Sequence, residues 1–429
     1  MTLNINACWT GRRPVARFPD GFLWGVATAA HQVEGNNVGS DVWLMEHLPG
    51  TVYREPSGDA TDFYHRYPDD IAVIAALGLN AFRFGIEWAR IEPEDGEISN
   101  AALDHYSRVV DTCLRHGIEP VLTLHHFTSP QWLIRHNGGW RGLDTAQRFA
   151  DYAAAVMSRL GDRVRWVCTI NEANVPALVI GSGLLPGSWK TKLDETNALA
   201  ARAFGVDEDD FCPFFPAASD EKAVAVVGQA HRLAVDAVHA VTPGARVGVT
   251  LALQQIVAEP GGEQLAERAD EFVNRRYLRD MGAVGDFVGV QTYTRIAFGP
   301  DGVKPPVGQV SDNGLELAPG ALAATCRQAY RITGLPVLVT EHGVDFDDTD
   351  DELRAALIED TLCQLAPAIA DGVDVRGYLH WSLVDNFEWF NGYHGHFGLL
   401  GNDRATQRRW IRPSAVRYGE IARANESPA

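Results

Sequence analysis

The stretch VLTLHH at residues 121–126, followed by AQRFADYAAAVMSRLG at 146–161 and RWVCTI at 165–170, has the pattern of a β-α-β unit. The two flanking segments are near-continuous apolar runs, as expected of parallel strands that are covered on both faces. The middle segment has helical periodicity and ends at Gly161, and glycine is expected directly after the last turn of a helix. This stretch therefore predicts two parallel strands joined by a helix.

The same alternation of strand and helix patterns extends along the chain. Six more apolar runs predict strands, namely FLWGVATA from Phe22, AFRFGI from Ala81, RVGVTLAL from Arg246, FVGVQTY from Phe287, VLVTEHG from Val337 and VRGYLHWSL from Val375. The chain contains eight such strand and helix units, and no part of it differs in composition in a way that would indicate a second domain. It therefore predicts an α/β fold with a single (β/α)8 TIM barrel. A doubly wound sheet is the alternative architecture. We expect one domain over residues 1–429, in which residues 1–17 form an N-terminal extension.

Two long segments between the predicted elements lack a strand or helix pattern. VDEDDFCPFFPAASDE starts at Val206, and GPDGVKPPVGQVSDNG starts at Gly299. We expect both to be surface loops. Loops of this length in a compact fold are commonly the walls or lids of a pocket.

The composition limits the kinds of partner. The chain has 429 residues, of which 46% are hydrophobic and 22% charged, and a net charge of −19. The negative charge argues against nucleic acid or an anionic membrane as a partner. The first residues contain no apolar signal region, and no segment has the run of about eighteen uncharged apolar residues that a membrane span needs. A cytoplasmic setting is therefore expected, and the oligomeric state stays open, a homo-oligomer included.

Cysteine and histidine residues do not indicate a metal site or a disulfide framework. The six cysteines have no C-x-x-C spacing, and several lie inside apolar runs, which favours reduced thiols in the core. His394 and His396 lack a third ligand at a recognisable spacing, so we expect neither a metal nor another cofactor. A metal-dependent hydrolase that uses these two residues with His125 and His126 is a rival hypothesis.

Polar and aromatic side chains gather at the carboxyl ends of the predicted strands, which in a barrel meet in one pocket. The residues found there, or shortly after, are Gln32, Glu34, Arg83, Glu87, His125, His126, Asn171, Glu172, Gln291, Tyr293, Glu341, His342, Trp381, Glu388 and Trp389. Acids and amides match sugar hydroxyls, and indole rings cover the apolar face of a pyranose. The pocket is therefore expected to bind a sugar.

Two of these residues, Glu172 and Glu341, are suited to cleaving a glycosidic bond. They follow or end two strands that a barrel places on opposite sides of one pocket. One carboxylic acid must protonate the leaving oxygen, while a second carboxylate attacks the anomeric carbon or activates water. A separation of about 5 to 5.5 Å gives retention and about 6.5 to 9.5 Å gives inversion, and both outcomes stay open at this point.

Six motifs, in order, resemble those of family 1 glycoside hydrolases, the β-glucosidase family, over nearly the whole chain. They are FPDGFLWGVATAAHQVEG at 18–35, FRFGIEWARI at 82–91, TLHHFTSPQWL at 123–133, TINEA at 169–173, VTEHG at 339–343 and HWSLVDNFEW at 380–389. TINEA is similar to the family's acid/base motif, and VTEHG to its nucleophile motif.

The resemblance implies a retaining exo-β-glycosidase, a β-glucosidase first, that removes the terminal sugar of small β-glycosides without a cofactor. Glu341 would be the nucleophile that forms a covalent glycosyl-enzyme, and Glu172 would be the general acid and then the general base. Arg83 and Tyr293 would support the nucleophile. The sugar-binding residues that the resemblance implies are Gln32, His126, Asn171, Trp381, Glu388, Trp389 and Phe397.

Four departures from the family's pattern limit these expectations. Ala173 replaces a proline, His342 replaces an asparagine, and Gln291-Thr292 replace Asn-Tyr. The imidazole at 342 is expected to alter the field or the pH profile of the nucleophile. Leu315 stands where a stacking tryptophan is common, which favours an apolar or aromatic aglycone over a second sugar. A transglycosylase or a specialised natural-product β-glycosidase is the alternative function, and a non-catalytic carbohydrate-binding barrel is a more remote one.

Overall fold

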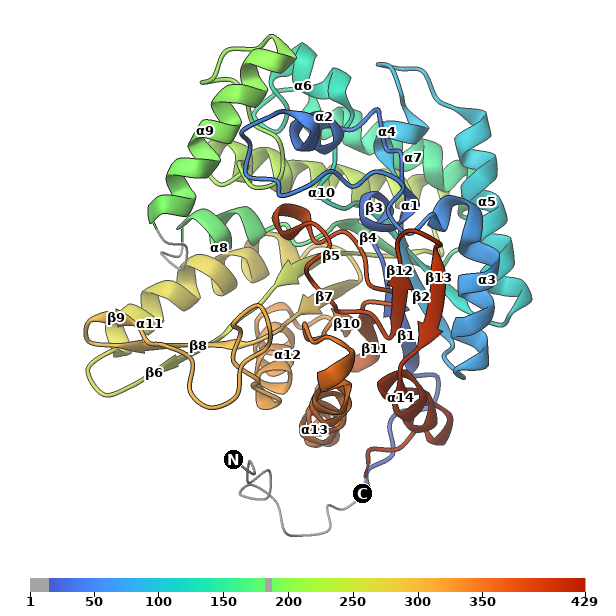
Figure 1. Cartoon of the computed structure of the whole chain (residues 1–429), viewed down its shortest axis with the longest axis vertical. Helices are drawn as coiled ribbons and strands as arrows, with labels where there is room; N and C mark the ends of the chain where they lie inside the picture. Colours follow the sequence, from blue (N-terminus) through green and yellow to red (C-terminus); the bar gives the residue numbers. More distant parts are fainter. Residues whose placement is uncertain (1–14, 182–186, 429) are drawn as a thin grey trace.

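The computed structural model describes residues 15–181 and 187–428, and its centre is a closed barrel of eight parallel strands (Figure 1). The strands are β1 (Leu23–Ala27), β2 (Ala81–Gly85), β3 (Glu119–His125), β4 (Trp166–Ile170), β5 (Arg246–Ala252), β7 (Phe287–Gln291), β10 (Val337–Glu341) and β11 (Val375–Trp381). Their order around the barrel follows the chain, and β1 closes the ring by pairing with both β2 and β11. The predicted TIM barrel is confirmed, and the doubly wound alternative is wrong.

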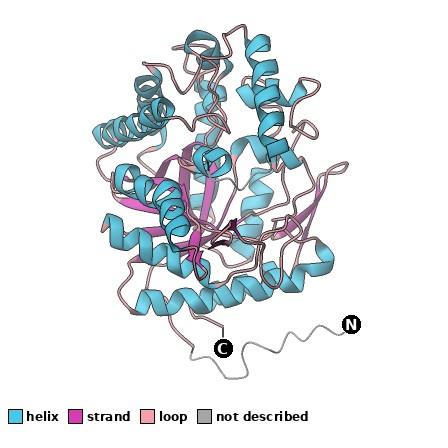
Figure 2. Ribbon diagram, turned by 90° about the vertical axis from the view of Figure 1, so that its left-hand side faces the viewer, coloured by secondary structure: helices cyan, strands magenta, loops and turns pink. Residues whose placement is uncertain are grey.

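Helices surround the barrel (Figure 2). The longer ones are α3 (Phe63–Ala76), α5 (Asn100–Arg115), α7 (Thr145–Leu160), α9 (Gly187–Phe204), α10 (Glu221–Val241), α12 (Gly320–Thr333), α13 (Asp351–Ala370) and α14 (Pro413–Ala424). The shorter ones are α1 (Ala30–Glu34), α2 (Asp41–His47), α4 (Trp88–Ile91), α6 (Gln131–Asn137), α8 (Val175–Gly181) and α11 (Glu263–Asp270). Because helices cover the outside and side chains fill the inside, strands such as β2 and β4 are buried along their whole length. This explains their near-continuous apolar sequences.

The inside of the barrel is apolar at its amino end. Ala81, Val121, Trp166, Phe287 and Leu338 lie at or near the first residues of their strands and belong to one buried cluster. This cluster fills the barrel below the polar residues. The site is therefore confined to the carboxyl ends of the strands, as in other barrels of this kind.

Two small sheets lie outside the barrel. One contains β6 (Gln255–Ala258), β8 (Arg295–Gly299) and β9 (Gly302–Val303), and it projects from the barrel in Figure 1. The other is the hairpin of β12 (Leu400–Asp403) and β13 (Arg408–Ile411). Most residues from 300 to 315 are exposed, so the surface loop predicted after Gly299 is confirmed.

The surface loop predicted from Val206 is wrong for its central part. Phe211, Cys212, Phe214 and Phe215 are all buried. The Phe214 ring packs edge-on against Trp140, with ring centroids 5.2 Å apart. Acidic and proline residues outnumber the apolar residues in this segment, which is why its sequence predicts a surface loop. In the structure, burial of its aromatic rings determines its position.

The two ends of the described chain lie side by side. The Ala16 amide donates to Ser427 Oγ at 2.9 Å, and the indole N–H of Trp24 donates to Asn425 Oδ1 at 2.9 Å. Of the N-terminal extension expected at 1–17, residues 1–14 lie outside the described residues, while Arg17 forms a backbone bridge with Glu426. Among residues 15–181 and 187–428, no helix has the length and apolar character needed to cross a membrane.

Candidate active site

The carboxyl ends of the barrel strands open into a cavity of about 600 Å³. The predicted site residues that line it are Gln32, His126, Glu172, Tyr293, Glu341, Trp381, Glu388, Trp389 and Phe397. The other two, Arg83 and Asn171, are buried behind the cavity wall and hydrogen-bond residues that line it. The structure therefore brings together the eleven residues that were given a catalytic, supporting or sugar-binding role. Of the other residues expected at the strand ends, Glu34, Glu87, His125, Gln291 and His342 do not line the cavity.

Glu341 is the last residue of β10 and is held by donors on both carboxylate oxygens. Arg83 Nη1 donates to Oε1 at 2.6 Å, and the Tyr293 hydroxyl donates to Oε2 at 2.7 Å. Burial raises the pKa of Glu341, and the positive charge of Arg83 is the main cause that opposes this rise. The arrangement favours an ionised carboxylate at this position.

Glu172 lies just beyond β4 in a left-handed backbone conformation, with φ of 44°. This conformation is uncommon for a residue with a side chain, and it is held by a hydrogen bond from the Glu172 amide to Thr250 Oγ1 at 2.9 Å. The Ala173 amide donates to the Thr250 carbonyl at 3.1 Å. A proline at 173, which has no N–H, could not form this second bond, so Ala173 adds an anchor to the turn.

The carboxyl groups of Glu172 and Glu341 differ in how strongly each holds a proton. Burial raises the pKa of Glu172 well above its usual value, and the negative charge of Glu341 raises it further. Arg83 lowers the pKa of both groups, but it bonds only to Glu341 directly. When the pair carries one proton, that proton therefore resides on Glu172.

Asn171 fixes the orientation of its neighbours. Its Oδ1 accepts hydrogen bonds from Arg83 Nη2 at 2.5 Å and from Gln291 Nε2 at 2.9 Å, so its amide nitrogen must face His126 Nε2, 3.0 Å away. Burial and the charge of Arg83 lower the pKa of His126 well below its usual value, so the ring is neutral. Since Nε2 accepts from Asn171, the proton of His126 is on Nδ1.

Three buried polar atoms on residues that line the cavity have no hydrogen-bond partner among the residues that the structure describes. They are His126 Nδ1, Gln32 Oε1 and Glu388 Oε1. The other end of the Gln32 amide is fixed, because its nitrogen donates to the Phe387 carbonyl at 2.7 Å. Buried polar groups are normally paired, so one donor and two acceptors left open in one cavity are suited to the hydroxyls of a ligand.

Aromatic rings form the sides of the same cavity. The indole of Trp381, at the end of β11, stacks near-parallel to the His126 ring at 25°, with centroids 5.8 Å apart. The Trp389 ring lies at 15° to His126. Phe397 meets the Tyr293 ring edge-on. Flat apolar faces beside open polar atoms match a pyranose, which has hydroxyls at its rim and C–H bonds on its faces.

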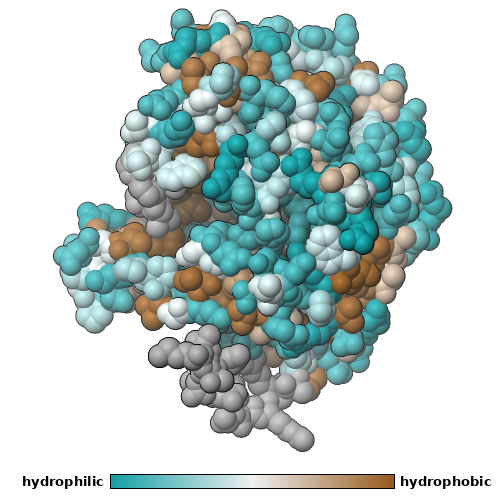
Figure 3. Space-filling view, viewed as in Figure 1, coloured by the Kyte–Doolittle hydropathy of each residue, from teal (hydrophilic) through white to brown (hydrophobic). Residues whose placement is uncertain are grey.

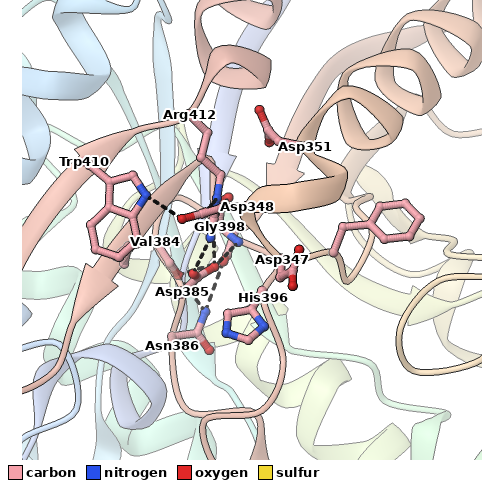
Figure 4. A network of polar contacts seen from close by, with 12 residues as sticks. Asp347, Asp348, Asp351, Val384, Asp385, Asn386, His396, Gly398, Trp410 and Arg412 are labelled. Atoms are coloured by element: carbon pink, nitrogen blue, oxygen red, sulfur yellow. Dashed lines mark hydrogen bonds and ion pairs between the residues drawn. The ribbon is translucent and has the colours of Figure 1, made fainter.

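The segment that follows β11 carries Glu388, Trp389 and Phe397, and it is anchored by a buried arginine (Figure 4). Arg412 donates to both oxygens of Asp385, at 2.8 and 2.7 Å, and to Asp348 at 2.6 Å. A bidentate pair of this kind fixes position as well as charge. The segment predicted to bind the sugar is therefore held in position by Arg412.

His342 does not act as a charge beside the nucleophile. Its ring bonds the hydroxyl of Tyr378 at 2.7 Å and reaches Thr361 on α13, outside the barrel. Burial lowers the pKa of His342 to about 3, so the ring is neutral over the ordinary pH range. The expected effect of this imidazole on the field at Glu341 is therefore absent.

The histidines of the rival metal hypothesis do not converge. His125 bonds Ser129 and packs on Trp140, burial lowers its pKa to about 3, and His394 is exposed. In the part of the chain that the structure describes, no three histidine, cysteine or acidic side chains are grouped so as to hold a metal ion.

Sequence reasoning missed two contributors to the site. Thr250, on β5, accepts from the Glu172 amide, and its hydroxyl donates to Asn171 Oδ1 at 3.2 Å. Phe215 lines the cavity from the segment mispredicted as a surface loop. One feature of the sequence points to Thr250, because it is a polar residue within an otherwise apolar strand segment.

Comparisons with known proteins agree with this geometry. The model of the family described as "Glycosyl hydrolase family 1" matches residues 15–299 and 304–427. Thermostable beta-glucosidase B of Thermobispora bispora is 34% identical, over 95% of this chain and 91% of its own length. Beta-glucosidase A of Thermotoga maritima is 32% identical, over 96% and 99%. The crystal structure of the beta-glycosidase BGL167 is similar with a TM-score of 0.90 and 48% identity, covering 96% of this chain and 98% of that one.

Proposed function

Because the chain belongs to glycosyl hydrolase family 1, it is a retaining O-glycosyl hydrolase of the β-glucosidase type, and we propose that Glu341 and Glu172 carry out its double displacement. The observation that supports these roles is the asymmetry of the pair. Glu341 accepts hydrogen bonds from Arg83 and Tyr293 on its two oxygens, while Arg83 makes no direct bond to Glu172, whose pKa is raised by burial and by the charge of Glu341. One group is prepared as a nucleophile and the other as an acid.

In the first step, the ionised carboxylate of Glu341 attacks the anomeric carbon. Glu172 gives its proton to the glycosidic oxygen, the bond to the aglycone breaks, and the aglycone leaves as an alcohol. The hydrogen bonds from Arg83 and Tyr293, one to each carboxylate oxygen of Glu341, orient the carboxylate for this attack. The product of this step is a covalent glycosyl-enzyme.

In the second step, Glu172 acts as a base. The ester at Glu341 carries no negative charge, so one cause of the raised pKa of Glu172 disappears. The Glu172 carboxylate then removes a proton from water, the oxygen of that water attacks the anomeric carbon, and the Glu341 carboxylate leaves. The sugar is released with the configuration that it had in the substrate.

The sugar is bound by the open polar atoms of Gln32, His126 and Glu388 between the rings of Trp381 and Trp389. β-Glucosides are the first candidates. β-Galactosides and β-fucosides follow, because a change at one hydroxyl leaves the other contacts in place.

The roles are tested by hydrolysis of aryl β-glycosides with wild type, Glu341→Gly and Glu172→Ala, in the presence and absence of azide. Both variants should lose activity by about 10³-fold or more. Azide should restore Glu341→Gly with an α-glycosyl azide as product and Glu172→Ala with a β-glycosyl azide. Glu92→Gln is the matched control, because Glu92 is buried but bonds Trp88 away from the cavity. Azide products of the opposite configuration would reverse the assignment.

A further inference from the structure

The cavity continues past the two carboxyl groups into an outer chamber with a different chemistry. Its apolar lining comes from α8, from the segment before α10, from β8 and from the exposed loop that follows β9, and includes Val175, Val179, Phe215, Ile296, Pro305 and Leu315. Figure 3 shows hydrophobic residues gathered on the projection that β6, β8 and β9 form. If the sugar occupies the inner end as proposed above, this chamber holds the aglycone.

Three polar residues of the outer chamber, Thr294, Arg295 and Glu316, are hydrogen-bonded to one another. Arg295 Nε donates to Glu316 Oε1 at 2.7 Å, and the other oxygen of Glu316 accepts the Val307 amide at 3.1 Å. The Thr294 hydroxyl donates to the Glu316 carbonyl at 2.9 Å. A second sugar would bury its hydroxyls here against an aliphatic wall with few free partners, which is costly. The outer chamber therefore favours a hydrophobic aglycone.

Lys304 also lines the outer chamber, and it differs from the hydrogen-bonded residues just described. The chain has 37 lysine and arginine residues, of which four are lysines, and Lys304 alone among those four lines the cavity. Lys190 pairs with Asp194 at 3.4 Å, whereas Lys304 forms no ion pair or side-chain hydrogen bond with any described residue. Its side chain lies across Gly299, where an added Cβ would be 2.5 Å from the Lys304 Cε. The glycine leaves the space that the lysine occupies.

The unpaired acidic groups of the cavity lie at its other end. Glu172, Glu341 and Glu388 surround the sugar position there, with the negative charge of the catalytic pair on Glu341, and the one acid of the outer chamber, Glu316, is neutralised by Arg295. An anionic group on a ligand would be repelled at the inner end and attracted at Lys304. A neutral aglycone would leave this ammonium without a partner.

We propose that the natural aglycone is hydrophobic and carries an anionic group that pairs with Lys304. The inference rests on the proposed function, because it takes the inner end as the sugar site. It identifies the substrate class as β-glycosides of hydrophobic acids, with Lys304 as the residue that selects them. Carboxylate, sulfate and phosphate share the chemistry that Lys304 recognises.

The test uses aryl β-glucosides that carry a carboxylate on alkyl chains of increasing length, each compared with its methyl ester. We expect the ratio of kcat/KM for acid over ester to be highest at one chain length. Lys304→Met should lower that ratio about fivefold, the effect of one partly exposed ion pair, and Lys304→Arg should restore it. The ratio should also fall in high salt. Matching sulfate and phosphate esters show which anion is preferred.

Lys222→Met is the control variant, because Lys222 lies in the first turn of α10 and does not line the cavity. Unchanged ester hydrolysis by Lys304→Met shows that the variant is folded. An acid-to-ester ratio that Lys304→Met leaves unaltered at every chain length would overturn the role of Lys304. Cellobiose hydrolysis as efficient as that of the aryl esters would overturn the hydrophobic aglycone. Failure of wild type on every simple aryl β-glycoside would instead refute the proposed function.

Discussion

Glu172 and Glu341 influence each other through their charges, which leads to a prediction about pKa. In Glu341→Gln the negative charge next to Glu172 is gone, so the pKa of Glu172 should fall, while burial should still hold it above its usual value. The measurement is a pH titration of the Glu172 carboxyl carbon by NMR in the variant and in wild type. In wild type, activity should be lost as pH rises through this pKa, because the protonated form is the acid. A pKa of Glu172 that stays the same or rises in the variant would contradict the coupling.

Residue types and strand ends were sufficient to predict that Glu172, Glu341 and the polar residues proposed to bind the sugar meet in one cavity, because the carboxyl ends of barrel strands share one pocket. Thr250 was missed because its contribution is a hydrogen bond between neighbouring strands, which no local pattern shows. The outward position of His342 could have been predicted. Successive side chains of a strand face opposite sides, so the residue after an inward Glu341 points away from it.

Among the connecting elements, the segment after β11 depends on Arg412 for its position, and this can be tested. In Arg412→Met, Asp385 and Asp348 lose their partner, and removing one member of a buried pair costs about 3 kcal/mol or more. We expect a lower thermal midpoint and a higher KM for aryl β-glucosides, with a smaller change in kcat. Arg412→Lys should recover only part of both, since it cannot form the bidentate pair.

Arg376→Met is the matched control for this prediction. Arg376 lies on β11 and pairs with Asp374, but both side chains are well exposed, so the loss should be below about 1 kcal/mol. If Arg412→Met lowers stability no more than Arg376→Met does, the buried pair does not anchor the segment.

Barrel strands were predictable because burial on both faces leaves a near-continuous apolar run, and long helices were predictable because burial on one face leaves a clear period in the sequence. The short strands β6, β8, β9, β12 and β13 were not predicted. They have two to five residues each and are half exposed, which is too short for a period to be seen. The buried position of Phe215 depends on rings from distant segments, such as Phe127 and Phe390.

The stability of the whole molecule should depend on pH through Asp41, at the start of α2. Its Oδ1 accepts the amides of Val42 and Ser129, and burial raises its pKa to about 7, from 3.8. Between these two values the folded chain holds a proton that the unfolded chain has released, so stability falls as pH rises from about 4 to about 7. In Asp41→Asn this contribution is removed, and the fall in thermal midpoint between pH 5 and pH 8 should be smaller by about 1 to 2 °C. Equal falls in both proteins would exclude Asp41 as a cause.

The pairing of β1 with β11, together with the bonds from Ala16 and Trp24 to Ser427 and Asn425, has a consequence for biosynthesis. The first strand leaves the ribosome some 350 residues before its partner does, since β1 begins at Leu23 and β11 at Val375. The backbone amides and carbonyls of β1 that will bond β11 have no partner strand through most of translation. Strand β1 therefore lacks one of its two partners until β11 has been synthesised, and this open edge is available for wrong pairings during that time.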